Sequence, residues 1–255
     1  MKIPALKGTV FLALGLMDAS IAFSQTNAPL GAAAQMNLDA LAAGGNSATV
    51  RLYDNRYEGL KGSPFFMDAW APGQIELKAG NTGKTQIIKD LQLKYDVFSN
   101  LLVAVSPNSK DTLQISTSPV ISFSLNLPTG GNPLEFRRIS EAQAFDPTLA
   151  NEFFAVLHDS KDGKVALVKR IAKKKVEANF KGPYSAGQTY DELVNETNYY
   201  VVANGKMQRV KLNKKSMVEA LPNQADKLKA YISSQKLSMS SEADLIKVAS
   251  YYQTL

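Results

Sequence analysis

Alternating apolar and polar residues run through the chain from about residue 49 to residue 212. Ile75 and Leu77 are flanked by polar neighbours, and the same alternation continues over residues 91–97. Gly, Pro, Asn and Asp residues separate these short runs, a pattern that is typical of antiparallel strands joined by turns. Because few of the intervening segments have the length of a helix, the sequence predicts a mainly β fold: an antiparallel β-meander, a sandwich or a partly closed barrel.

Two connections within this β-rich part carry the residues that tight hairpins need. Asp162-Gly163 and Asn204-Gly205 both tolerate the positive φ angles of short hairpin turns. We therefore predict two hairpins, in which residues 153–157 pair with 164–171 and residues 199–202 pair with 207–210. His158 falls in the first connection, where we expect it to be solvated.

The spacing of apolar residues changes in the C-terminal segment, residues 213–255. There, residues 225–232 and 245–252 carry apolar side chains at helical intervals. Ser240 or Ser241 precedes two acidic residues, and a serine in this position is a favourable N-cap for a helix. The sequence predicts two or three short helices here.

The first 24 residues have the order of a secretory signal peptide. Two lysines precede an apolar run at residues 10–17, and Ala22-Phe23-Ser24 supplies the small side chains of a cleavage site. We predict cleavage after Ser24, which would place the mature protein in the periplasm or outside the cell.

This apolar run is shorter than the about 20 residues that a membrane-spanning helix needs, and Asp18 interrupts its end. No later apolar stretch is long enough, so we expect no transmembrane span in the mature chain. Residues 25–48 are rich in Ala and Gly and suit a linker. The expected domains are the signal peptide at 1–24, the linker at 25–48, a β-rich domain at 49–212 and the helical segment at 213–255.

The chain has no cysteine and one histidine. These counts exclude disulfides, thiol nucleophiles, zinc–thiolate and iron–sulfur sites, and metal sites with several histidines. Gly83-Lys84-Thr85 resembles the end of a phosphate-binding loop, but Lys78 occupies the position of its first glycine, so we interpret residues 80–85 as a hairpin turn. His158 and Asp159 would point to opposite faces of a strand, and the sequence has no nucleophile elbow. We therefore predict no catalytic residue, no metal ligand and no cofactor.

Positive charge is concentrated in one stretch of a chain whose formal net charge is +6. Residues 161–215 hold thirteen Lys or Arg against five Asp or Glu. Five of the cations crowd one predicted strand, namely Lys169, Arg170, Lys173, Lys174 and Lys175. They could protect an exposed sheet edge from aggregation, or contact an anionic envelope component such as lipid head groups or anionic glycans. We expect no nucleic-acid partner, because export removes the usual one and no known binding module is present.

Tyr57, Phe66 and Trp70 belong to an aromatic group near the start of the β-rich part. Such side chains could stack on a sugar or peptide ligand. They could equally fill a small β core, and we favour the core.

Several short motifs occur together: Tyr53-Asp54-Asn55, Gly62-Ser63-Pro64-Phe65, Leu91-Gln92-Leu93-Lys94-Tyr95-Asp96-Val97, Glu242-x-Asp244-Leu245 and Tyr251-Tyr252-x-x-Leu255. In combination they resemble a family of uncharacterised exported bacterial proteins with a signal peptide, a β-rich body, a lysine-rich later part and a short helical C-terminus. The resemblance implies an envelope or extracellular location and brings no activity or catalytic residue. The Ala-rich stretch at residues 31–45 looks like an addition to the family pattern.

The sequence favours an exported, non-enzymatic cell-envelope protein with a structural, scaffolding or ligand-binding role. Its partner would be an anionic envelope component or another envelope protein. One alternative is an envelope glycan hydrolase, because the fold can bring catalytic carboxylates together without a local motif. The other alternative is a peripheral membrane-surface binder that uses the lysine-rich residues 161–215.

Overall fold

The computed structural model describes residues 50–52, 57, 59–79, 84–105, 112–183 and 187–255. The predicted signal peptide with its cleavage after Ser24 and the predicted linker at residues 25–48 lie outside the described residues. So do residues 80–83 of the predicted hairpin turn.

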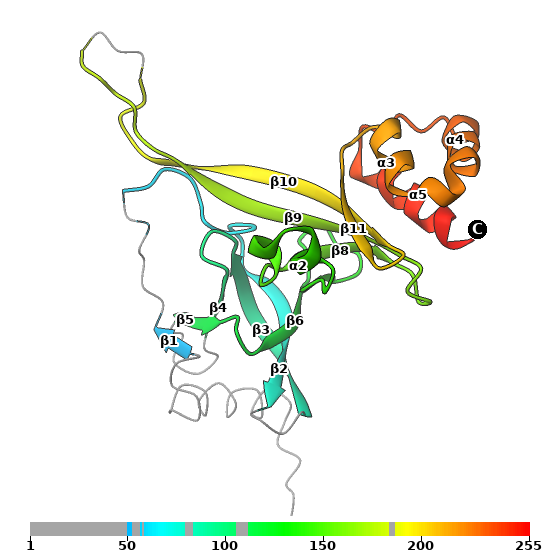
Figure 1. The fold of residues 1–255 in the computed structure, drawn as a ribbon. Helices are drawn as coiled ribbons and strands as arrows, with labels where there is room; N and C mark the ends of the chain where they lie inside the picture. The colour runs from blue at the N-terminus through cyan, green and yellow to red at the C-terminus, as the bar shows by residue number, and fades with distance from the viewer. Residues whose placement is uncertain (1–49, 53–56, 58, 80–83, 106–111, 184–186) are drawn as a thin grey trace, which may run out of the picture.

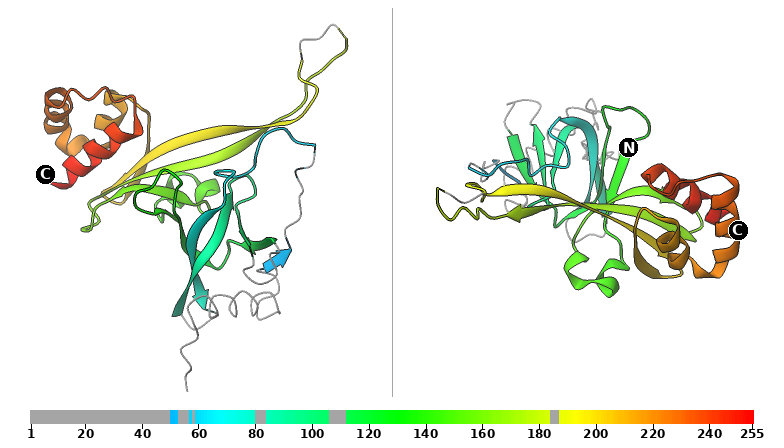
Figure 2. Two further views of the ribbon diagram at one scale, coloured as in Figure 1. Left: turned by 180° about the vertical axis from the view of Figure 1, so that it is seen from behind. Right: turned by 90° about the horizontal axis from the view of Figure 1, so that it is seen from above.

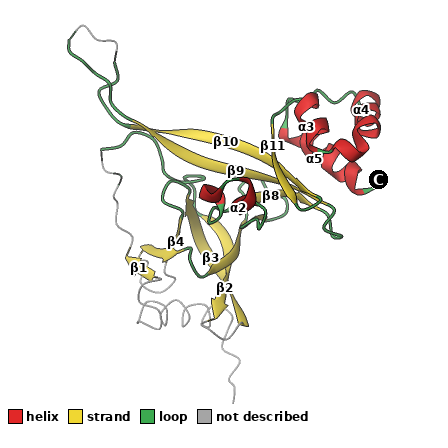
Figure 3. Cartoon of the chain, in the orientation of Figure 1, coloured by secondary structure: helices red, strands yellow, loops and turns green. Residues whose placement is uncertain are grey.

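One antiparallel sheet of 11 strands forms the framework of the described chain (Figures 1 and 3). Its strand order is β1-β5-β4-β3-β2-β6-β7-β8-β9-β10-β11, so the edge strands β1 and β11 do not pair with each other and the sheet does not close. The strands are β1 (Val50–Leu52), β2 (Ala71–Ala79), β3 (Lys84–Asp96), β4 (Leu101–Val105), β5 (Thr112–Ser116), β6 (Val120–Leu125), β7 (Leu134–Arg137), β8 (Phe154–Asp159), β9 (Val165–Val176), β10 (Glu192–Ala203) and β11 (Lys206–Val210). The predicted mainly β fold is confirmed. Strands β2 to β5 form one meander, and β6 to β11 form a second that begins beside β2.

Aromatic side chains occupy the centre of the larger core, on one face of the sheet. The register places Phe123 of β6 opposite Phe136 of β7, and their rings stack with centroids 4.7 Å apart. Tyr95 and Phe153 pack against this pair at centroid distances of 5.1 to 5.6 Å. Alternate positions of β6, such as Ser122, point to the opposite face, because successive side chains of a strand alternate.

Helices cover the second core, which lies over the start of β9, the end of β10 and β11 (Figure 1). The helices are α3 (Lys214–Ala220), α4 (Ala225–Ser234) and α5 (Glu242–Gln253), with the short 3₁₀ turn η3 (Pro222–Gln224) between α3 and α4. We call these helices the cap. Leu167 and Val201 of the sheet pack with Leu228 and Leu245 of the cap. The predicted helical C-terminal part is therefore confirmed.

Local capping residues set the starts of two cap helices. The side chain of Asn213 accepts a hydrogen bond from the Ser216 amide at the start of α3. The Ser241 hydroxyl accepts one from the Asp244 amide at the start of α5, which decides between the two serines that the sequence offered. None of the described helices is long and apolar enough to cross a membrane.

The opposite face of the sheet carries a third, smaller core. Helix α2 (Ala142–Phe145) and the 3₁₀ turn η2 (Pro147–Leu149) lie over this face. Beneath them, Tyr200 of β10 packs edge-on against Phe154 of β8, with ring centroids 5.6 Å apart. The start of β9 and the end of β10 are thus covered on both faces.

The outer halves of β9 and β10 continue past the body as a two-stranded extension (Figures 1 and 2). Strand β8 pairs with β9 only as far as Lys169, and β11 pairs with β10 only from Tyr199. We call residues 170–198 the arm. Its strands are longer than the sequence predicted, because lysines and polar residues continue the ladder without apolar alternation.

Candidate functional site

The five predicted basic residues all lie on β9, where the strand leaves the body. The ammonium group of Lys169 lies 2.7 Å from the Glu242 carboxylate of α5. The guanidinium group of Arg170 lies 3.2 Å from the Glu152 carboxylate. Both cations therefore tie the base of the arm to the body and the cap.

The three lysines farther along the arm differ in their surroundings. Lys175 pairs with Asp191 at 2.7 Å, and this contact raises the pKa of Lys175 and lowers that of Asp191. Lys173 is half-buried; burial lowers its pKa, and the nearby carboxylate of Asp68 opposes this shift. Lys174 is exposed and makes no ion pair within the described part of the chain. Of the five cations, Lys174 is thus the one that is exposed and has no carboxylate partner among the described residues.

The arm as a whole is close to electrically neutral. Residues 170–198 hold five Lys or Arg and four Asp or Glu, a surplus of one. The returning strand β10 brings Glu192 and Glu196 back beside the lysines of β9. A row of lysines in the sequence is therefore not a strongly basic surface in the fold.

Apolar side chains are exposed on the arm, although most apolar side chains of the body are buried. Four of them expose 36% to 48% of their surface: Val176, Phe180, Tyr190 and Val194. The strand register pairs Lys174 with Val194 and Val176 with Glu192, so Val176 and Val194 share one face with Lys174 and Glu192. This mixture of apolar and charged groups is typical of a protein contact surface.

The segment that precedes β2 is bonded to the arm at the start of β10. The Lys61 amide donates to the carbonyl of Asp191 at 2.9 Å, and the Leu193 amide donates to the carbonyl of Lys61 at 2.8 Å. The Lys61 ammonium also donates to the Tyr190 hydroxyl at 2.8 Å. Gly62 has a φ of +92°, and a Cβ there would lie 2.7 Å from the Leu193 carbonyl oxygen. Only glycine suits this close approach.

The predicted stacking residues Tyr57, Phe66 and Trp70 do not form one platform. The Tyr57 hydroxyl donates to the buried Asp96 carboxylate at 2.6 Å. Phe66 packs edge-on against Phe136 of the core, with ring centroids 5.2 Å apart. These contacts favour a packing role for Tyr57 and Phe66.

Trp70 is the exposed member of that group, with 37% of its surface accessible. The Lys94 ammonium lies 5.0 Å from the Trp70 ring centroid and 4.8 Å from that of Phe65. Lysine and two rings therefore already form cation–π contacts. A stacking ligand would have to displace Lys94.

His158 lies at the end of β8 rather than in a solvated turn, so this expectation was wrong. A register shift between Val156 and His158 places the imidazole opposite Leu167, on the face covered by the cap. Its Nδ1 atom lies 3.2 Å from the Ser250 hydroxyl of α5, and its buried Nε2 atom has no hydrogen-bond partner within the described residues. The sequence shows no signal for this β-bulge.

Carboxylates are the groups on which the hydrolase alternative depends. Glu76 and Glu135 line a pocket of about 230 Å³ on the polar face of β2, β6 and β7. The Ser122 hydroxyl donates to Glu76 at 3.0 Å. In the part of the chain that the structure describes, no group of three or more His, Asp or Glu side chains could hold a metal ion.

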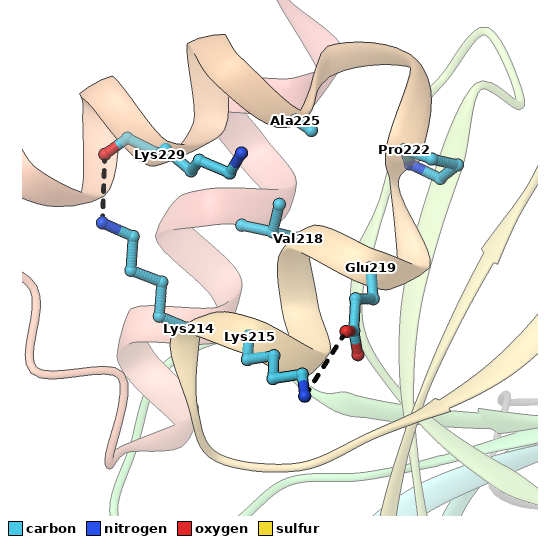
Figure 4. Close-up of a pocket in the computed structure, with 7 residues that line it drawn as sticks. All are labelled: Lys214, Lys215, Val218, Glu219, Pro222, Ala225 and Lys229. Atoms are coloured by element: carbon cyan, nitrogen blue, oxygen red, sulfur yellow. Dashed lines mark hydrogen bonds and ion pairs between the residues drawn. The ribbon is translucent and has the colours of Figure 1, made fainter.

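A groove with a volume of about 620 Å³ lies in the cap, between α3 and α4 (Figure 4). Its apolar lining comes from Val218, Pro222 and Ala225. Its charged lining comes from Lys214, Lys215, Glu219 and Lys229. Sequence reasoning missed this groove, because it depends on how α3 and α4 diverge.

Comparison of the chain with protein families, curated proteins and solved structures gives no match.

Proposed function

We propose that this protein is an exported, non-enzymatic protein of the cell envelope that serves as a scaffold by binding another envelope protein through the arm. The N-terminal sequence supports export, with cleavage after Ser24. The observation that carries the scaffolding role is the arm itself. It extends past the packed body and presents Val176, Phe180 and Val194 to solvent.

The charge of the arm favours a protein partner over an anionic surface. An anionic membrane or glycan attracts a surface with a large positive surplus. The arm has a surplus of one, because Glu192 and Glu196 lie beside its lysines. Apolar side chains among balanced charges suit a partner that offers both kinds of group.

The edges of the arm add a second means of contact. From Arg170 to Val176, strand β9 pairs with β10 alone among the described strands. Its other edge can therefore accept a strand from a partner, as in β-strand addition. Lysines along such an edge oppose pairing with a second copy of the same strand, which favours a different protein as partner.

Photo-crosslinking in cells that export the protein tests this proposal. A photoreactive residue is placed at Phe180 or Val194 on the arm, and at Ile87 on β3 as the control. Ile87 is also exposed, at 50%, but lies on the body. We expect a discrete protein adduct from both arm positions and none from Ile87. The V176S/V194S variant should weaken the adduct from Phe180 roughly fivefold, as expected for losing about 1 kcal/mol of contact energy.

Three outcomes would contradict the proposal: no adduct, equal adducts from Ile87 and the arm, or adducts with lipid alone. Co-sedimentation with anionic vesicles provides the contrasting measurement. Salt-sensitive vesicle binding that is lost in K173Q/K174Q/K175Q would favour the peripheral membrane alternative instead.

A further inference from the structure

The positive charge of the chain is concentrated around the cap. Residues 206–236 hold eight Lys or Arg and two Asp or Glu, a surplus of six that equals the net charge of the whole chain. This stretch comprises β11, α3, η3 and α4. The structure thereby separates a nearly neutral arm from a basic stretch formed by β11, α3, η3 and α4.

The groove described above lies in this basic region, between α3 and α4 (Figure 4). Buried Leu221 anchors the junction of the two helices, and Pro222 begins the single 3₁₀ turn that joins them. The two short helices diverge from this junction. Val218 of α3 and Ala225 of α4 line the space between them. A volume of about 620 Å³ is within the usual range for a small-molecule site.

Three ammonium groups stand at the edges of this apolar surface. Lys214 reaches from α3 towards α4, where its ammonium lies 3.0 Å from the Ser233 hydroxyl and 3.5 Å from the Lys229 carbonyl oxygen. This contact brings a positive charge to one end of the groove (Figure 4).

The other two lysines have weak carboxylate partners. The Lys229 ammonium lies 3.1 Å from the exposed Asp226 carboxylate, and the Lys215 ammonium lies 3.9 Å from Glu219. Exposed ion pairs of this kind contribute little free energy and exchange readily. A bound anion can therefore take their place.

We propose that the groove binds a free long-chain carboxylate. The hydrocarbon chain lies on Val218, Pro222 and Ala225, and the carboxylate is bound by the ammonium groups of Lys214 and Lys229. An apolar strip beside three cations and one anion matches a ligand with an alkyl chain and one negative charge. This site is distinct from the arm, and it does not depend on the proposed scaffolding role.

Titration calorimetry of the full mature chain tests the assignment, with decanoate as the probe below its micelle concentration. Acetate has the charge without the chain, and decyltrimethylammonium has the chain with the opposite charge. We expect decanoate to bind with one-to-one stoichiometry and both comparison probes to bind at least tenfold more weakly. The K214Q/K215Q/K229Q variant should weaken decanoate binding at least tenfold.

The matched control K206Q/K227Q/K236Q removes the same charge from lysines that do not line the groove. It should change affinity less than twofold. A225F, which fills the groove without removing charge, should abolish binding while the circular dichroism spectrum stays unchanged. The proposal is overturned if decanoate does not bind, if both triple variants lose affinity equally, or if A225F still binds. Binding of anionic vesicles or an acidic amphipathic peptide that decanoate does not displace would overturn it as well.

Discussion

Tyr57 donates its hydroxyl proton to the carboxylate of Asp96 over 2.6 Å and so links two segments 39 residues apart. Asp96 is fully buried at the end of β3. The backbone amides of Phe98 and Ser99 also donate to this carboxylate, at 3.0 and 2.9 Å. The Asp96 side chain thereby fixes both the turn that follows β3 and the segment at Tyr57 that precedes β2.

Replacing Asp96 by alanine should destabilise the fold more than replacing it by asparagine. D96A leaves two amides and the Tyr57 hydroxyl without their acceptor, which should lower the free energy of unfolding by about 3 kcal/mol. D96N retains one acceptor oxygen and no longer buries a charge, so its cost should be about 1 kcal/mol. Urea denaturation of the two variants measures the difference. Equal costs would show that the hydrogen bonds to Asp96 contribute nothing to stability.

The pH dependence of stability should change in D96N. Burial raises the pKa of Asp96 above its ordinary value of 3.8, although the hydrogen bonds from Tyr57, Ser99 and Phe98 oppose this. A carboxyl that holds its proton more tightly when folded adds stability below the unfolded pKa, and loses this contribution as pH rises through the folded pKa. The unfolding free energy of the wild type should therefore fall relative to D96N as the pH rises above 3.8, the ordinary pKa of aspartate. A difference that rises with pH would contradict the raised pKa.

Much of the β-rich body follows from local pattern. Alternation in the sequence places Leu93 and Tyr95 on the buried face of β3, as the structure has them. Two of the motifs that carried the family resemblance also contact each other: Phe65 forms an antiparallel bridge with Asp96, and the Val97 amide donates to the Pro64 carbonyl at 3.0 Å. The sequence shows each motif, but only the fold shows that they meet.

The arm and the groove depend on relationships that no local pattern contains. The pairing of Lys175 with Asp191 appears only once β10 returns beside β9. In the sequence alone, without this pairing, the lysines resemble a basic surface. The groove requires the angle between α3 and α4, which a short turn at Pro222 sets through packing. The sequence therefore locates the basic stretch, but only the fold shows which carboxylates its lysines meet.

Ser241 and Ser240 provide a direct test of helix capping in the cap. The Ser241 hydroxyl accepts a hydrogen bond from the Asp244 amide at 3.2 Å, whereas the Ser240 hydroxyl contacts that of Ser238 at 2.8 Å. S241A should lower the free energy of unfolding by about 1 kcal/mol, the usual cost of losing a serine N-cap. S240A should change it by less than about 0.5 kcal/mol. Thermal denaturation of both variants is the measurement, and the reverse ranking would place the N-cap at Ser240.

Alanine substitutions at Gly62 and Gly59 distinguish the cost of backbone conformation from the cost of close contact with the arm. Both glycines have positive φ, +92° and +90°, but only at Gly62 would a Cβ meet another atom, the Leu193 carbonyl oxygen at 2.7 Å. G59A should cost about 1 kcal/mol, and G62A about 3 kcal/mol, because it adds a collision to the same backbone strain. Since the Leu193 amide donates to the Lys61 carbonyl, G62A should also speed hydrogen exchange at Leu193. Faster exchange there in G62A but not in G59A would show that Gly62 holds the arm against the body, whereas equal effects would leave only the φ angle to explain both.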